Sequence, residues 1–143
     1  MSQIMIRGYM SGTFDLFHVG HLNIIRRARQ LCDHLTVGVH ATGAWKGKVT
    51  FVPFEERIAI VSSVRFVDKA IPSYSEDTEA WSVLRYQRLF VGTDYKDSDR
   101  FKKYEEFFSR KDVRIFYIPY TTKTSSTKLR LLIDSFLSKA GQC

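Results

Sequence analysis

Two histidines, His18 and His21, are the residues of this chain whose types and spacing point most directly to chemistry. They end the run Gly-Thr-Phe-Asp-Leu-Phe-His-Val-Gly-His at residues 12–21, which follows a strand-like segment and opens an amphipathic helix. The unpaired backbone N–H groups and the dipole at a helix N-terminus attract anions. Two imidazoles three residues apart therefore predict a phosphate-handling site. The alternative, a helix start with one hydrogen-bonded core histidine, suits this context less well.

The apolar pattern predicts strands and helices that alternate along the whole chain. Strands are expected at residues 4–10, 35–39, 66–71, 88–92 and 113–118. Helices are expected at residues 20–32, from Pro53 onward, and at 79–88, 101–110 and 125–138; the last has an apolar face of Leu129, Leu132, Ile133, Phe136 and Leu137. This alternation predicts an α/β fold: one Rossmann-like, doubly wound domain over residues 1–143, with about five parallel strands in the order 3-2-1-4-5 and helices on both faces.

Three loops in this pattern follow strands at the same edge of the predicted sheet. They cover residues 12–21 after the first strand, 92–95 after the fourth and 119–126 after the fifth. Ligands of such folds bind at the carboxyl ends of the strands, close to the point where the strand order reverses. We therefore expect the three loops to meet around one site.

The charge of the chain favours an anionic partner. Its net charge is +7 and its isoelectric point about 9.5, but the basic residues are scattered and form no dense stripe with interleaved aromatic residues. A small polyanion explains this charge as well as nucleic acid does, and a solvated basic surface accounts for most of these residues; we expect no nucleic-acid partner. No apolar run reaches the roughly 18 residues of a membrane helix, and no secretory signal is evident. With only Cys32 and Cys143, no disulfide framework is implied, and we expect a cytoplasmic protein without a membrane partner.

The run at residues 12–21 resembles the signature of the nucleotidyltransferase superfamily that carries His-x-Gly-His, and within it the cytidylyltransferase branch typified by glycerol-3-phosphate cytidylyltransferase. Residues 65–68, Arg-Phe-Val-Asp, are similar to that branch's Arg-Tyr-Val-Asp element. Residues 120–127, Tyr-Thr-Thr-Lys-Thr-Ser-Ser-Thr, resemble its Arg-Thr-Glu-Gly-Ile-Ser-Thr-Thr segment. The resemblance covers nearly the whole chain. It implies a homodimeric, Mg²⁺-dependent enzyme that joins CTP to a small phosphorylated acceptor, such as glycerol 3-phosphate or another phospho-alcohol, and releases pyrophosphate.

Such a reaction needs no general base, because the acceptor phosphate is already ionised near neutral pH. Catalysis then consists of positioning and of stabilising charge at the α-phosphorus. His18 and His21 would act as hydrogen-bond donors. The resemblance gives Lys46 a transition-state contact and makes Lys48 a ground-state phosphate ligand, although composition alone would make both solvated surface lysines. No protein metal site is expected, since Mg²⁺ would arrive with the triphosphate.

The resemblance and the predicted topology assign further residues to the two substrates. Nucleotide binding is expected from Gly12, Thr13, Phe14, Gly20, Lys48, Thr93, Asp94, Tyr120, Thr121, Ser125, Ser126 and Thr127. Acceptor binding is expected from Asp15, Trp45, Arg57 and Arg85.

Several of these residues have structural alternatives. Asp15 more readily caps the turn into the first helix, Arg57 fits an ion pair equally well, and Trp45 suits packing. Residues 125–127 fit helix N-caps, a role compatible with phosphate binding. Asp68, with Arg65, suits the fold or a dimer contact.

Three departures from the family pattern leave both substrates open. Tyr120 replaces an arginine, Thr93 replaces an aspartate that helps hold the nucleoside, and the acidic segment 73–80 lacks an expected lysine. An adenylyltransferase that uses ATP is therefore one alternative. A non-catalytic basic module that binds nucleotide or nucleic acid is another.

Overall fold

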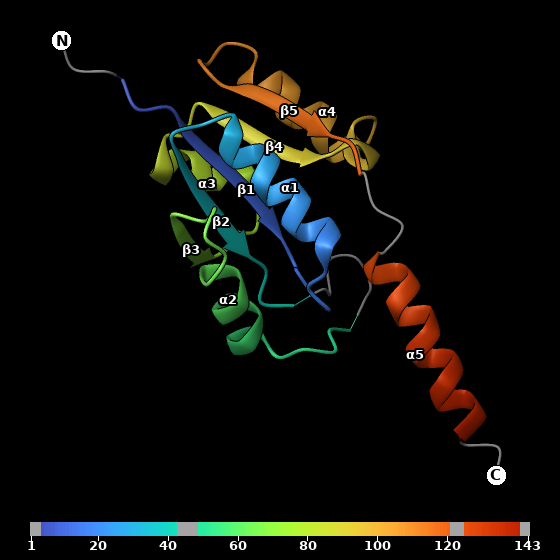
Figure 1. Ribbon diagram of the computed structural model, residues 1–143. Helices are drawn as coiled ribbons and strands as arrows, with labels where there is room; N and C mark the ends of the chain where they lie inside the picture. Colours follow the sequence, from blue (N-terminus) through green and yellow to red (C-terminus); the bar gives the residue numbers. More distant parts are fainter. Residues whose placement is uncertain (1–3, 43–48, 121–124, 141–143) are drawn as a thin grey trace.

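The structure is a computed structural model and describes residues 4–42, 49–120 and 125–140 (Figure 1). Five parallel strands form one sheet in the order β3-β2-β1-β4-β5, which confirms the predicted fold class and strand order. The strands are β1 (Arg7–Gly12), β2 (His34–Val39), β3 (Lys69–Pro72), β4 (Arg88–Gly92) and β5 (Arg114–Ile118). The helices are α1 (Val19–Gln30), α2 (Phe54–Ser62), α3 (Asp77–Leu84), α4 (Asp99–Phe108) and α5 (Ser126–Ala140), with a 3-10 turn, η2 (Thr93–Tyr95), after β4.

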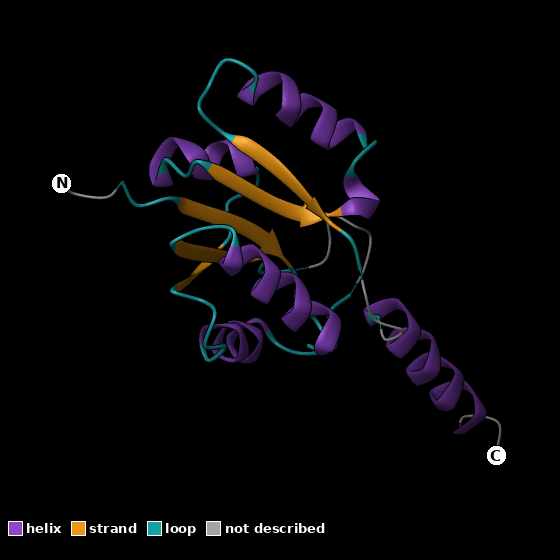
Figure 2. Ribbon diagram, turned by 45° about the horizontal axis from the view of Figure 1, so that its top comes forward, coloured by secondary structure: helices purple, strands orange, loops and turns teal. Residues whose placement is uncertain are grey.

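The sheet is covered on both faces, so it has two hydrophobic clusters. One lies under α1 and α2 and includes Ile25, Val37 and Val61, all fully buried. The other lies under α3 and α4, where Tyr9 stacks on Tyr86 with ring centroids 5.2 Å apart. Figure 2 shows helices on either side of the strands. This two-layer cover is what alternating strands and helices with right-handed crossovers produce.

A crevice opens between β1 and β4, where the strand order reverses. These two central strands pair only at Gly8 with Arg88 and at Tyr9 with Leu89. Their carboxyl halves run on without pairing, whereas β1 and β2 pair along all six residues of each strand. The separated strand ends leave room for a ligand at the switch point of the sheet.

Three elements differ from the predicted ones by more than two residues at one end. The first strand begins at Arg7, because the preceding Ile4 is 87% exposed and has nothing to pack against. The third strand begins at Lys69, since Phe66 packs on the core from a turn. The third helix covers residues 77–84 instead of 79–88 and ends at Arg85, whose backbone is left-handed (φ 52°).

The turn before β3 is held by Asp68. Its carboxylate accepts a hydrogen bond from the Leu35 N–H at 2.8 Å and pairs with Arg29 at 2.9 Å. Asp68 therefore serves the fold, which was one of the two roles expected for it.

Helix α5 extends away from the rest of the molecule (Figures 1 and 2). Its predicted apolar face is present but mostly solvent-facing: Leu132, Phe136 and Leu137 are 67%, 75% and 60% exposed. The apolar periodicity of the sequence therefore predicted the helix correctly, but it did not predict that the apolar face is exposed. None of the helices in the described ranges has the length and apolar character that crossing a membrane would need.

Candidate active site

The two histidines cap helix α1, and this fixes which ring nitrogen carries the proton. His18 is the N-cap, and its Nδ1 accepts the Gly20 N–H at 3.0 Å. His21 Nδ1 accepts the backbone N–H of His18 at 3.2 Å, which completes a reciprocal capping box. A neutral imidazole that accepts at Nδ1 carries its hydrogen on Nε2. Burial lowers the pKa of His18, which favours this neutral form.

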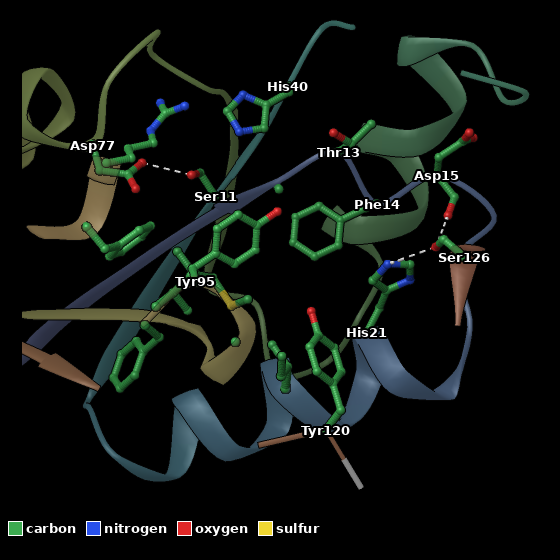
Figure 3. Close-up of a pocket in the computed structure, with 18 of the residues that line it drawn as sticks. Ser11, Thr13, Phe14, Asp15, His21, His40, Asp77, Tyr95, Tyr120 and Ser126 are labelled. Carbon is green, nitrogen blue, oxygen red and sulfur yellow. Dashed lines mark hydrogen bonds between the residues drawn. The ribbon is translucent and has the colours of Figure 1, made fainter. Parts of the chain in front are cut away.

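The two Nε2–H groups converge on the start of α5. Ser126 Oγ lies 3.3 Å from His18 Nε2 and 3.5 Å from His21 Nε2, and it donates its own hydrogen to the Asp15 carbonyl at 2.9 Å. Figure 3 shows Ser126 between Asp15 and His21. The ring centroids of the two histidines are 4.1 Å apart. The pair thus presents two donors to one oxygen atom, an arrangement that suits a phosphate oxygen.

The loop that carries the histidines to this position is strained. Phe14 and Leu16 both have left-handed backbones, with φ near 54° and 53°. Such conformations cost of order 1 kcal/mol each and persist only where the surroundings enforce them. Here Asp15, between them, is buried and accepts the N–H groups of Phe51 at 2.8 Å and Val52 at 2.9 Å. Strain supported in this way is typical of functional loops.

Asp15 does not cap the first helix, so that expectation is wrong. His18 occupies the N-cap, and the Asp15 carboxylate instead pairs with Arg130 of α5 while holding residues 51 and 52. Asp15 therefore ties the histidine loop to α5 and to the segment that precedes α2.

Arg57 is not in an ion pair within the described part of the chain, and its guanidinium is buried (1% exposed). It donates to the carbonyl oxygens of Val52, Thr13, His40 and Ala41 at 2.6–2.8 Å. Four of its five N–H groups are thereby used. Arg57 therefore joins three loops, those that contain Thr13, Val52 and residues 40–41. This geometry leaves it little capacity to contact an acceptor.

A cavity of about 160 Å³ lies in the crevice between β1 and β4 and is lined by His21. Other predicted residues at its wall are Gly12, Thr13, Phe14, Asp15, Tyr120 and Ser126. The Thr13 hydroxyl is buried and has no hydrogen-bond partner in the described structure. An oxygen of a bound ligand would supply that partner. The cavity joins the end of β1 to the loops after β4 and β5, as predicted.

The loops after β4 and β5 approach each other closely. A Cβ atom on Gly92 would lie 2.6 Å from Asp94 Oδ1 and 2.9 Å from the Tyr120 ring, so a larger residue there would displace these two side chains. Thr93 and Asp94 begin η2 directly after β4, between the cavity-lining residues Gly92 and Tyr95. Ser125 Oγ accepts the Lys128 N–H at 3.1 Å and thus caps α5, as expected for a hydroxyl at that position. Thr127 lines a shallower groove beside residues 49–51.

Arg85 is not brought to the site. It ends α3 and precedes the start of β4, so it lies at the amino edge of the parallel sheet, where its guanidinium stacks 4.2 Å above the Trp81 ring. This corrects its expected acceptor role, since the cavity lies at the carboxyl edge. Lys46, Lys48, Trp45 and Thr121 lie outside the described residues.

The structure adds residues that sequence reasoning missed. Ser11, His40, Asp77, Arg100 and Arg130 also line the cavity. Ser11 and His40 stand directly at the ends of predicted strands, a signal that was available. Asp77 lay in an acidic segment and Arg130 among ordinary helix charges, so their burial is visible only in three dimensions.

These features define the class of protein: a doubly wound sheet with a pair of imidazole donors at its switch point is suited to nucleotidyl transfer. The chain belongs to the cytidylyltransferase-like family of enzymes, whose model matches residues 9–132. It is similar to glycerol-3-phosphate cytidylyltransferase of Bacillus subtilis (strain 168), with 30% identity over 123 residues that cover 83% of this chain and 90% of the relative.

Longer relatives match over part of their length. The chain is 35% identical over 103 residues to ethanolamine-phosphate cytidylyltransferase of Arabidopsis thaliana, which covers 68% of this chain and 24% of that protein. Among solved structures, it resembles the lipopolysaccharide core biosynthesis protein of Thermoplasma volcanium GSS1 with a TM-score of 0.69 at 20% identity, covering 84% of this chain and 99% of the other. That likeness supports the fold alone.

Proposed function

We propose that this enzyme transfers the cytidylyl group of CTP to a small phosphorylated alcohol and releases pyrophosphate. An oxygen of the acceptor phosphate attacks the α-phosphorus of CTP and forms a new P–O bond. The bond from the α-phosphorus to the oxygen bridging it to the β-phosphorus breaks, and pyrophosphate leaves with that electron pair. The products are a CDP-linked alcohol and pyrophosphate. No proton transfer is needed at the attacking oxygen.

One observation carries this proposal: both histidines accept backbone hydrogen bonds at Nδ1 and direct Nε2–H at the same oxygen atom. Two fixed donors aimed at one point stabilise charge that develops on phosphate oxygens and need no reorganisation during the reaction. The buried Thr13 hydroxyl offers a third contact at the same wall of the cavity.

Mg²⁺ fits this scheme as a partner of the nucleotide. No group of three metal-ligating side chains occurs among the residues that the structure describes. We propose that the triphosphate oxygens hold the ion, which neutralises part of their charge. Lys46 is proposed to contact the transferred phosphoryl group and Lys48 the triphosphate, on the strength of the family resemblance.

A two-stage experiment tests the proposal. Thermal shifts are first measured with CTP, ATP, GTP and UTP in the presence of Mg²⁺. Pyrophosphate release is then followed with the stabilising nucleotide and a panel of phosphorylated alcohols. We expect stabilisation by CTP and release that depends on the acceptor. Stabilisation by ATP alone would instead support an adenylyltransferase. No release with any acceptor, together with tight, salt-sensitive nucleic-acid binding, would support a binding module.

A homodimer is proposed for the same reason as the reaction, namely the family resemblance. Light scattering after size-exclusion chromatography tests it: a mass near twice 16.6 kDa supports the dimer, and a mass near 16.6 kDa overturns it.

A further inference from the structure

The amino edge of the sheet, at the opposite end of the strands from the cavity, carries a row of positive charge. Four of the five strands begin with arginine or lysine, and β2 begins with His34. The strand register places Arg7 beside His34 and, in the other half of the sheet, Arg114 beside Arg88. Because all five strands are parallel, these first residues form one row from Lys69 in β3 to Arg114 in β5. Figure 1 shows the strand starts on the side of the molecule away from α5.

The turns that lead into the strands add to this charge. The amino edge, taken as residues 4–7, 31–34, 63–69, 85–88 and 109–114, holds eight lysines or arginines and three aspartates. The other residues that the structure describes hold eleven lysines or arginines and twelve acidic side chains. The positive charge of the described chain is therefore concentrated at this edge, although the same residues are scattered in the sequence.

The eight cations are not neutralised from within the described part of the chain, where none of them forms an ion pair. Several lie over aromatic rings instead. Arg85 is 4.2 Å from the ring centroid of Trp81, and Lys111 is 3.9 Å from that of Phe107. A cation over a ring keeps its full charge, so these side chains are held in place and can still attract an anion.

Two of the three aspartates at this edge serve the fold. The carboxylate of Asp33 accepts the Ile6 N–H at 2.8 Å. Asp68 holds the turn before β3, and its charge is offset by Arg29, which is not one of the eight cations. The negative charge at the amino edge is thus small and largely engaged.

Exposed apolar side chains lie at the same edge. Ile4 and Met5, just before β1, are 87% and 53% exposed. Val83 and Phe107, in the last turns of α3 and α4, are 63% and 38% exposed. Cations mixed with exposed apolar side chains suit an anionic bilayer, whose phosphates meet the charge and whose acyl boundary accepts the apolar atoms. Nucleic acid would satisfy the charge and offer nothing to the aliphatic side chains.

We propose that the amino edge binds the surface of a membrane that contains anionic phospholipids, with Ile4, Val83 and Phe107 entering the headgroup region. The cavity lies at the carboxyl edge, so this mode of binding leaves it open to soluble substrates. Peripheral binding of this kind needs no membrane-spanning helix. The proposal departs from the sequence-based expectation of no membrane partner, because the basic residues come together only in the fold. It does not depend on the proposed function.

Co-sedimentation of the whole chain with vesicles tests the proposal. Vesicles are made of phosphatidylcholine alone or with about one third phosphatidylglycerol, and binding is measured at low salt and at about 0.5 M NaCl. We expect binding to the anionic vesicles to be at least about tenfold stronger than to the neutral ones, and to be lost at high salt. The triple variant Arg7→Gln, Arg110→Gln, Arg114→Gln should bind the anionic vesicles at least about tenfold more weakly. All three side chains are exposed, so urea unfolding and turnover without vesicles should be unchanged.

A matched variant controls for total charge. Lys102→Gln, Lys103→Gln, Lys139→Gln removes three charges from exposed positions outside the amino edge and should keep most of the binding. An equal loss in the two triple variants, or equal binding to neutral and anionic vesicles, would overturn the proposal.

The apolar contribution is measured separately with Val83→Ser. This variant should bind anionic vesicles about threefold more weakly and leave binding to a short single-stranded RNA unchanged. Vesicle binding that does not change in Val83→Ser, or RNA binding tighter than vesicle binding, would show that the edge is not a lipid-binding surface. Neither result would affect the proposed function, which pyrophosphate release tests in the absence of vesicles.

Discussion

Arg130 of α5 forms an ion pair with Asp15 in the loop after β1, and this contact joins segments 115 residues apart in sequence. Arg130 also donates to the Val49 carbonyl, so it holds the histidine loop and the segment before α2 together. Ser126 comes one helical turn before Arg130, and its Oγ lies 3.3 Å and 3.5 Å from the Nε2 atoms of the two histidines. The ion pair therefore sets the position of the α5 N-terminus over the site.

Loss of this ion pair should loosen α5 and slow the reaction. In Arg130→Gln the buried Asp15 carboxylate loses its charge partner, and breaking such a pair costs roughly 3–5 kcal/mol. Since α5 has no buried residue, we expect the cost to appear as undocking of that helix. Limited proteolysis should cleave α5 faster, and kcat/KM should fall about tenfold. Lys139→Gln, at the exposed end of α5, is the control; equal behaviour of the two variants would contradict this role.

The capping and donor roles of His18 can be separated by two substitutions. His18→Ala removes both, so it should lose about 1 kcal/mol of stability and about 100-fold in turnover. Asparagine is a good N-cap, so His18→Asn should regain the stability while turnover stays low, because no donor replaces Nε2–H. Urea unfolding and initial rates measure the two effects. Recovery of turnover in His18→Asn would show that capping alone explains this histidine.

Replacement of Arg57 by lysine should be strongly destabilising although the charge is kept. A single ammonium group cannot reach the four carbonyl oxygens that the planar guanidinium joins. Buried carbonyls left unpaired cost about 1–3 kcal/mol each, so we expect a loss of at least about 3 kcal/mol in urea unfolding. The exposed Arg110→Lys should change stability by less than about 0.5 kcal/mol. A small loss in Arg57→Lys would mean that solvent replaces these hydrogen bonds.

Asp77 should make the stability of the protein depend on pH in an unusual direction. Burial raises the pKa of its carboxyl above the ordinary value of 3.8. The folded state thus holds this proton more tightly than the unfolded state, and stability is lost as pH rises from about 4 through the raised pKa. Asp77→Asn cannot ionise, so it should be more stable than the parent at pH 8, with a difference that shrinks towards pH 4. Thermal unfolding across this range measures it. A difference independent of pH would contradict the raised pKa.

Local sequence patterns were sufficient to predict much of the structure of this protein. Alternating apolar segments predicted the parallel sheet and its strand order, because strand–helix–strand units with right-handed crossovers allow few arrangements. The spacing of His18 and His21 at a helix start predicted that the two rings lie close together, since the helix geometry itself places three-residue neighbours on one side. The hydroxyl at Ser125 predicted the cap of α5 in the same way.

Contacts between distant segments were decided only by the tertiary structure. Aspartate is a common N-cap residue, which is why Asp15 is expected to cap the first helix. The left-handed turn around Asp15 instead directs its carboxylate to residues 51, 52 and Arg130. Arg85 is expected from the sequence to bind the acceptor, whereas chain direction puts it at the opposite edge of the sheet. Burial of Asp77 depends on how α3 packs against β1. Sequence thus determines the elements and the type of chemistry, while the partners of each charged group depend on which loops meet at the end of the sheet.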